Sequence, residues 1–309
     1  MIDSAAVTNS VVINLLLIGL GYLIKKVGLL EREHGQVLNR LVLYVTLPAL
    51  NLQVISRAPL SWRLMILPVL SLASGVLMSQ VGRGVARALK LSRQDTGTFV
   101  VSLCGVMGAL AYPFVEAAYG ETGVRAAAIS DLGNAIAIFA VAYYFSYQYA
   151  DDGSFEPRAI LKKVALFFPL HAFIAALVFN LVCVDICGLP GGLIDTLAGM
   201  NSPLMLLSLG VYLELNVSRE ERQLLLNQLG VKYGVGLAIA ILYILVLPFR
   251  GETRGTLFLL PLMPTSLSTL LYSVEQDLNP RLAAMLISLT MVISVIITTV
   301  TILGFRQFF

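Results

Sequence analysis

Long apolar stretches recur along the whole sequence, and they constrain the fold more than any other feature. A helix needs roughly 17–25 mainly apolar residues to cross a hydrocarbon core about 30 Å thick. Of the 309 residues, 58% are hydrophobic and 13% are charged, against about 25% charged in a typical soluble domain. We therefore expect an all-α integral membrane protein. Its ten predicted transmembrane helices lie at about 8–24, 37–55, 63–82, 97–119, 123–149, 164–184, 194–213, 228–248, 255–274 and 282–304.

The basic residues between these spans are unevenly distributed. If the N-terminus is external, fifteen of the 21 Lys and Arg residues lie on one side, among them Lys25, Lys26 and Lys232. The side richer in Lys and Arg is cytoplasmic by the positive-inside rule, which places both termini outside. We expect a plasma membrane location, the inner membrane in a bacterium. The net charge of +3 then reflects topology rather than nucleic-acid binding.

The two halves of the chain resemble each other weakly. Pro48 in the second predicted span and Pro203 in the seventh lie 155 positions apart. Five spans per half is an odd number, so the second half must enter the membrane in the opposite sense. We predict a five-plus-five inverted repeat, with a first five-helix repeat at 1–150, a cytoplasmic linker at 151–163 and a second repeat at 164–309.

Small residues within the spans predict close helix contacts rather than substrate chemistry. Gly19 and Gly21 lie in the first predicted span, Gly75 lies in the third, and Gly210 lies in the seventh.

Two apolar segments are interrupted by glycine and proline at matching places in the two halves. They are 105–113 (GVMGALAYP) and 259–266 (LLPLMPTS). A break in a membrane helix frees backbone polar groups, which lipid cannot satisfy, so breaks occur where protein or a cavity surrounds them. Paired breaks of this kind are typical of the binding site of a secondary transporter.

Several motifs resemble those of the auxin efflux carrier family. They are 25–30 (KKVGLL), 46–51 (TLPALN), 111–120 (AYPFVEAAYG), 208–210 (SLG) and the stretch from 263–266 (MPTS) to 279–280 (NP). The likeness covers essentially the whole chain in order.

The resemblance implies a fold related to bile acid–sodium symporters and sodium–proton antiporters, with crossed, broken helices 4 and 9. The family includes plant auxin exporters and bacterial carriers of small carboxylates. Its fourth helix commonly carries an asparagine at the crossover, where this chain has Val106, and Gly105 replaces the crossover proline. The comparison places the first break at 105–108, which leaves Pro113 in the second half helix.

Half helices that meet near the midplane present N-termini with unpaired N–H groups and partial positive charge. Such ends suit an anion. The alternative for each hydroxyl is a hydrogen bond to its own helix. The candidate substrate-binding residues are Asn51, Gly105, Val106, Tyr112, Asn201, Ser202, Pro264, Thr265, Ser266 and Thr269.

Ionisable residues inside a span are costly, so they are functional candidates. Asp131 lies well inside the fifth predicted span, with Asn134 one turn later on the same face. Asp131 is a candidate to take up a proton, or to coordinate a cation together with the asparagine oxygen. The alternative is an aspartate neutralised by a hydrogen bond or lying nearer the interface.

We therefore expect a secondary active transporter of a small organic anion, a carboxylate, which works by alternating access. The crossover bundle would move against a scaffold of spans 1, 2, 6 and 7. Alternatives are a carrier of another substrate coupled to H⁺ or Na⁺, a channel, or a membrane sensor that does not transport. No enzyme motif is present. We expect a small organic anion, the bilayer and a second copy of the chain as partners, no nucleic acid, and no cofactor beyond a coupling proton or sodium ion.

Overall fold

The computed structural model describes residues 4–56, 62–150, 158, 168–182, 186, 188–212 and 222–305. These residues are organised as helices. Val106 and Thr265 also form an isolated antiparallel β-bridge. The all-α prediction is therefore confirmed for this part of the chain. The predicted linker at 151–163 lies outside it, apart from Arg158.

Six helical stretches are long and apolar enough to cross a membrane, and two shorter apolar ones accompany them. The predicted spans at 97–119 and 255–274 are interrupted helices, as their glycine and proline residues predict. The six long stretches are Val7–Lys26, Arg63–Ala88, Leu110–Gln148, Gly188–Val211, Arg222–Val246 and Pro280–Gly304, and the shorter ones are Val42–Ser56 and His171–Leu181. The chain is a multi-pass membrane protein.

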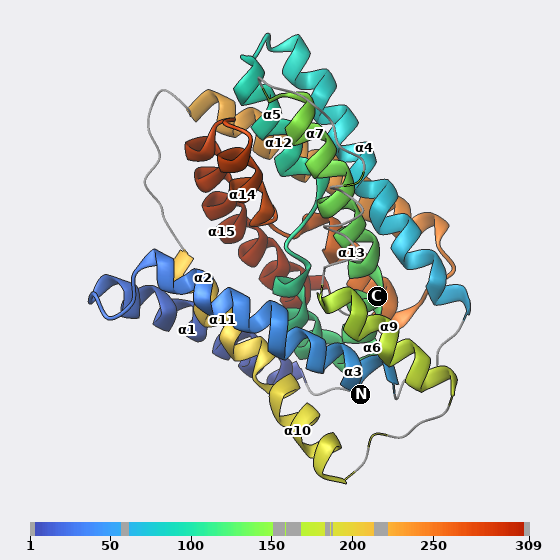
Figure 1. The fold of residues 1–309 in the computed structure, drawn as a ribbon. Coiled ribbons are helices and arrows are strands. Elements are labelled where there is room, and N and C mark those ends of the chain that lie inside the picture. The colour runs from blue at the N-terminus through green and yellow to red at the C-terminus, as the bar shows by residue number, and fades with distance from the viewer. Residues whose placement is uncertain are drawn as a thin grey trace.

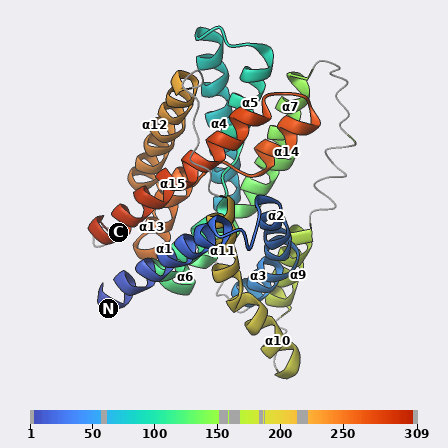
Figure 2. The same cartoon turned by 90° about the vertical axis from the view of Figure 1, so that its left-hand side faces the viewer.

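The helices form two sets, which Figures 1 and 2 show on different sides of the molecule. In the first helix set, α1 packs against α11, α2 against α11, and α3 against α9 and α10. This set comprises α1 (Ser4–Lys26), α2 (Arg32–Leu41), η1 (Val42–Thr46), α3 (Leu47–Ser56), α9 (Phe168–Leu181), α10 (Gly188–Gly199) and α11 (Asn201–Tyr212).

Two glycines let α1 and α11 approach closely. An added Cβ at Gly21 would lie 2.3 Å from the carbonyl oxygen of Leu207, and one at Gly210 would lie 2.1 Å from that of Ile18. The predicted close contacts are thus confirmed at Gly21 and Gly210. The prediction is wrong for Gly19, where an added Cβ would meet nothing within 4 Å.

In the second helix set, α4 packs against α5 and α6, α12 against α4, α13 and α15, and α14 against α15. Gly75 of α4 fits against the carbonyl of Cys104, as its predicted contact role requires. This set comprises η2 (Trp62–Met65), α4 (Ile66–Ala88), α5 (Arg93–Cys104), α6 (Gly108–Ile136), η3 (Ala137–Ala142), α7 (Tyr143–Gln148), α12 (Arg222–Val246), α13 (Gly251–Leu259), η4 (Leu260–Leu262), α14 (Ser268–Glu275) and α15 (Pro280–Phe305).

Helix α6 is two helices joined at Gly120. Gly120 has φ 58° and ψ −155°, so the chain changes direction there. Glycine suits this conformation because it has no Cβ to clash at positive φ. The residues before Gly120 therefore form one helix, and those after it form a second helix that continues into η3 and α7.

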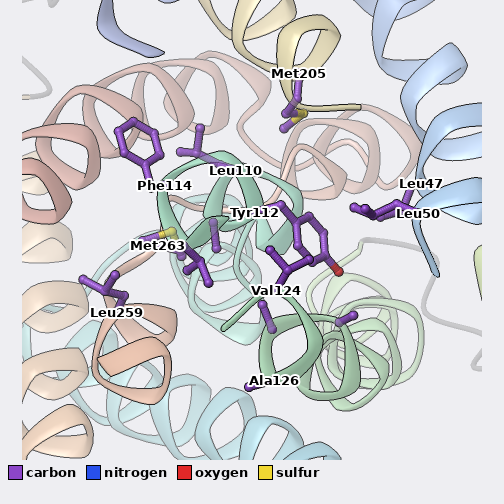
Figure 3. Packing of buried hydrophobic residues seen from close by; sticks show 14 of the residues in the cluster. Leu47, Leu50, Leu110, Tyr112, Phe114, Val124, Ala126, Met205, Leu259 and Met263 are labelled. Atoms are coloured by element: carbon purple, nitrogen blue, oxygen red, sulfur yellow. The ribbon is translucent and has the colours of Figure 1, made fainter. Parts of the chain in front are cut away.

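The first part of α6 lies at the centre of the largest hydrophobic core. Figure 3 shows Tyr112 on the side of α6 that faces Leu47 and Leu50 of α3, with Leu259 of α13 on the opposite side. Tyr112 is 1% exposed, and Leu259 is fully buried. Because α6 contacts α1, α3 and α11 as well as α4 and α13, it joins the two helix sets.

Lys232 was assigned to the cytoplasmic loops in the charge count, and the structure corrects this. It lies inside α12, with no exposed surface. Its Nζ has no hydrogen-bond partner among the described residues. Lys232 lies ten residues after the start of α12 and is buried, so it does not belong to a loop.

Candidate functional site

Two broken helices cross at one point. α5 ends at Cys104 and α6 begins at Gly108, while η4 ends at Leu262 and α14 begins at Ser268. Between these ends the chain is extended, and Val106 pairs with Thr265 in the antiparallel bridge.

The backbone N–H of Met107 donates to the carbonyl of Pro264 over 2.8 Å, which joins the two breaks directly. Both breaks occur where they were predicted, and Pro113 lies inside α6, within the second half helix.

Asn134 replaces the helical partners that Val106 loses at the break. The Asn134 Oδ1 accepts from the backbone N–H of Val106 at 2.9 Å, and its Nδ2 donates to the carbonyl of Val106 at 2.8 Å. A carboxamide can make both bonds because it carries the same donor and acceptor as a peptide group. Asn134 is 5% exposed, so these bonds are made away from water.

The second break is satisfied in a similar way by Thr290 of α15. The backbone N–H of Thr265 donates to the Thr290 Oγ1 at 3.1 Å. The Thr265 hydroxyl donates to the carbonyl of Ser102 at 3.2 Å. The sequence analysis did not identify Thr290. The signal that could have found it is the offset between the two halves: Thr290 lies 156 residues after Asn134, and Pro203 lies 155 residues after Pro48.

Several N–H groups at the breaks already have acceptors, contrary to the expectation that they are unpaired. Besides Val106, Met107 and Thr265, the N–H of Gly108 donates to the carbonyl of Val106 at 3.0 Å. The N–H of Ser268 donates to the Ser266 Oγ at 3.3 Å. What remains for a ligand is the partial positive charge of the helix ends and the Ser266 and Ser268 hydroxyls, which lie 2.8 Å apart.

The carboxylate of Asp131 lies against the N-terminus of α6. An added Cβ on Gly108 would lie only 2.1 Å from the Asp131 Oδ1. That oxygen accepts from the Asn134 Nδ2 at 2.8 Å, and the Asp131 Oδ2 accepts from the Tyr112 hydroxyl at 3.4 Å. An acidic group is favourable at the positive end of a helix. The protein's own carboxylate thus occupies one of the two predicted anion positions.

A cavity of about 600 Å³, measured to its open mouth, lies between the crossing and the first helix set. We call it the front cavity. Its polar groups come from the crossing, and its apolar wall includes Leu47 of α3 and Met205 of α11. The lining residues are Leu43, Leu47, Val106, Met107, Gly108, Asp131, Asn134, Ala135, Ile138, Phe139, Met205, Ser266, Leu267 and Ser268.

A second cavity, the rear cavity, lies on the other side of the crossing and has a volume of about 540 Å³ to its mouth. α4 contributes Ser71 and Ser74 to it, and α12 contributes Tyr243. Val106, Gly108, Asp131 and Asn134 line both cavities, so these residues form the partition between them.

The structure brings most, but not all, of the predicted site residues together. Gly105 lines the rear cavity, while Val106 and Ser266 line the front one. Pro264 and Thr265 form the crossing, and Tyr112 contacts Asp131. Thr269 is buried in the first turn of α14, where its N–H donates to the carbonyl of Ser266.

Three predicted residues belong neither to the crossing nor to the lining of either cavity. Asn51 is buried in α3. Asn201 accepts from the Thr46 hydroxyl at 3.0 Å inside the first helix set. Ser202 donates to a carboxylate oxygen of Glu116 at 3.1 Å, in a separate cavity between α1, α6 and α11.

Comparison with known proteins agrees with this architecture. The model of a family described as membrane transport protein matches residues 6–302. An uncharacterized transporter of Methanothermobacter thermautotrophicus is 30% identical over 298 residues, which cover 94% of this chain and 95% of the relative. An uncharacterized transporter of Methanocaldococcus jannaschii is 27% identical over 311 residues, which cover 93% and 95%. The chain therefore belongs to the membrane transport protein family, the auxin efflux carrier family that its motifs resemble.

Proposed function

We propose that the protein is a secondary active transporter of a small organic anion, a carboxylate with an apolar body, and that the anion binds in the front cavity. The observation that carries this proposal is the position of the cavity. It lies where two broken helices cross, and it is bounded on its other side by a different helix set.

The lining of the front cavity supports this class of substrate. Ser266 and Ser268 offer hydroxyl donors beside the N-terminus of α14, where the helix dipole favours negative charge. Leu43, Leu47 and Met205 offer apolar contact opposite them. A few placed polar groups in a mainly apolar pocket are typical of small-molecule sites.

The packing supports an inverted repeat of ten helices, with repeats at 1–150 and 164–309 and with both termini outside the inner membrane. Thr46 and Asn201 are themselves 155 residues apart, which is the offset between Pro48 and Pro203, and they hydrogen-bond to each other. Equivalent residues meet in this way only beside a two-fold axis. The pairing of α1 with α11 and of α3 with α9 has the same reciprocal form.

The two helix sets support a mechanism of alternating access. A substrate held between them becomes accessible from the other side when the second set moves against the first, around a site that stays near the midplane. The second set carries both half helices and Asp131, so the whole polar part of the site would move as one unit.

A second candidate is a carrier of a small organic cation. Among the described residues that line the front cavity, Asp131 is the one that carries a charge, and a carboxylate attracts an ammonium group. We rank it second because Asp131 already lies at a helix N-terminus and accepts two hydrogen bonds.

A thermal-shift screen distinguishes these candidates, because a ligand that binds the folded state raises its apparent stability. The probes are 3-methylbutanoate, phenylacetate and malonate, with 3-methylbutylamine as a cation that has the carbon skeleton of the first. We expect stabilisation by a carboxylate and none by the amine. Stabilisation by the amine alone would establish the second candidate instead.

Exchange of a labelled carboxylate in proteoliposomes, corrected with protein-free liposomes, separates a carrier from a sensor. We expect labelled anion inside to exchange with unlabelled anion outside. Binding without exchange would identify a sensor and contradict the transport proposal.

A further inference from the structure

The hydrogen bonds of Asn134 limit how its side chain can help Asp131 to hold a cation. The Asn134 oxygen accepts the N–H of Val106, and both of its amide hydrogens are used, one by Val106 and one by Asp131. A cation held by Asp131 and the asparagine oxygen would have to share that oxygen with the N–H of Val106. Within the part of the chain that the structure describes, no group of three or more His, Cys, Asp or Glu residues is placed to hold a metal ion.

The charges around Asp131 leave its carboxylate without a cationic partner. Among the residues that line the two cavities, titratable groups other than Asp131 are Cys104 at the end of α5 and Tyr243 of α12. Tyr243 donates to the carbonyl of Leu70 at 2.8 Å. Tyr112, on the same helix as Asp131, donates to it.

The other elements packed around the partition contribute uncharged groups. α4 lines the rear cavity with Ser71 and Ser74, and α13 with Leu257. α14 lines the front cavity with Ser268, and α11 lines it with Met205. No lysine or arginine lines either cavity among the described residues, so no cationic side chain there offsets a second negative charge.

An anion in the front cavity must therefore share an apolar, low-dielectric space with the Asp131 carboxylate. Two carboxylates in one site repel each other strongly, and they bind a proton between them more readily than either does alone. We propose that the substrate anion and Asp131 share one proton, which makes the proton the coupling ion and moves it across the membrane in the same direction as the anion. This inference rests on the proposed function, because it requires an anionic substrate.

The partition between the two cavities contains Asp131, the group that takes up the proton. Asp131 lines the rear cavity as well as the front one. The proton comes from an acid in the water on the side from which the anion enters, and it binds a carboxylate oxygen of Asp131, so no other co-reactant is needed. The anion enters from the front.

Calorimetry measures this proton directly. Binding of 3-methylbutanoate, phenylacetate or malonate is titrated in phosphate and in Tris, whose ionisation enthalpies differ, and the difference in heat gives the protons taken up per bound anion. We expect uptake of about one proton by the wild type, as for paired carboxylates, with no change when choline replaces sodium. Anion binding without proton uptake would overturn the inference and leave the proposed function intact.

Matched variants assign the proton to Asp131. Asp131→Asn resembles the protonated acid, so we expect it to bind the anion without proton uptake, while Asp131→Glu restores uptake. Asp277→Asn is the control, because Asp277 is exposed and its φ of 48° is one that asparagine tolerates. Proton uptake that persists in Asp131→Asn would overturn the assignment. Failure of every carboxylate to bind the wild type would instead contradict the proposed function.

Discussion

The carboxamide of Asn134 bonds both backbone polar groups of Val106, at 2.9 and 2.8 Å, and so completes a helix break that the chain itself leaves open. It also donates to Asp131. Support of the break and orientation of the acidic group thus depend on a single side chain. A change at Asn134 should therefore affect stability and anion binding together.

Replacement of Asn134 by alanine should lower stability substantially. It leaves the buried N–H and carbonyl of Val106 without partners, and each such group costs about 1–3 kcal/mol. Thermal unfolding in detergent measures the loss. The control is Asn227→Ala, since Asn227 accepts from Gln223 on the surface of α12. Equal unfolding temperatures for the two variants would contradict this role of Asn134.

Stability should depend on Thr290 in the second half of the chain as it depends on Asn134 in the first. Thr290→Val keeps the shape of the side chain but removes the acceptor of the Thr265 N–H, which costs about 1–3 kcal/mol. Thr290→Ser keeps the oxygen and should be much milder. The unfolding temperatures of the two variants test this directly, and a valine variant as stable as the serine variant would show that the bond to Thr265 contributes nothing.

Ser268 provides a test of the front cavity that spares the fold. Ser268→Ala removes a hydroxyl from the lining, but the Ser266 oxygen still accepts the backbone N–H of residue 268. A hydrogen bond to a charged group contributes about 1.5–3 kcal/mol, so carboxylate affinity should fall about ten-fold or more at unchanged stability. Thr196→Ala is the control, because Thr196 is exposed and bonds its own helix. An affinity equal to that of the control would place the anion elsewhere.

The broken helices and their supports differ in how far the sequence predicts them. Pro264 and the glycines at 105 and 108 mark the breaks locally, because proline and glycine disturb a helix wherever they occur. No feature of the neighbouring sequence identifies Thr290 and Ser102 as partners of the breaks. A threonine in an apolar helix reads as a residue bonded to its own turn, which Thr290 also is, and only the packing of α15 against the break adds its second role.

The surroundings of charged residues were harder to predict than the positions of helices, because they also depend on how distant elements pack. Asp131 was singled out because an acid inside a span is costly, but its contact with Gly108 depends on how α6 folds back at Gly120. Lys232 was counted with the loop charge although it lies near the start of the predicted span at 228–248, because hydropathy sets span ends only to within a few residues. Gln228 and Gly236, one turn before and after it on the same face, lie against Ser102 of α5 and Pro261 of η4, so its burial depends on this packing.

Gly108→Ala tests the contact between the N-terminus of α6 and Asp131. The added methyl group would lie 2.1 Å from the Asp131 Oδ1, so the carboxylate must move away from the helix end. We expect lower stability and loss of the proton uptake that accompanies anion binding. Gly230→Ala is the control, because an added Cβ at Gly230 in α12 would meet nothing within 4 Å. Wild-type proton uptake in Gly108→Ala would show that this position of Asp131 is not required.

Lys232 should reduce stability in the wild type. Its Nζ is buried in α12 without a hydrogen-bond partner among the described residues, and replacing buried charged groups by apolar ones of similar volume often stabilises a protein by about 1–4 kcal/mol. Lys232→Met should therefore raise the unfolding temperature in detergent. Lys232→Ala should not, because it leaves a cavity where methionine would fill the space. If Lys232→Met instead lowers the unfolding temperature, the ammonium group has a stabilising partner in the folded protein, and its burial is part of how α12 packs.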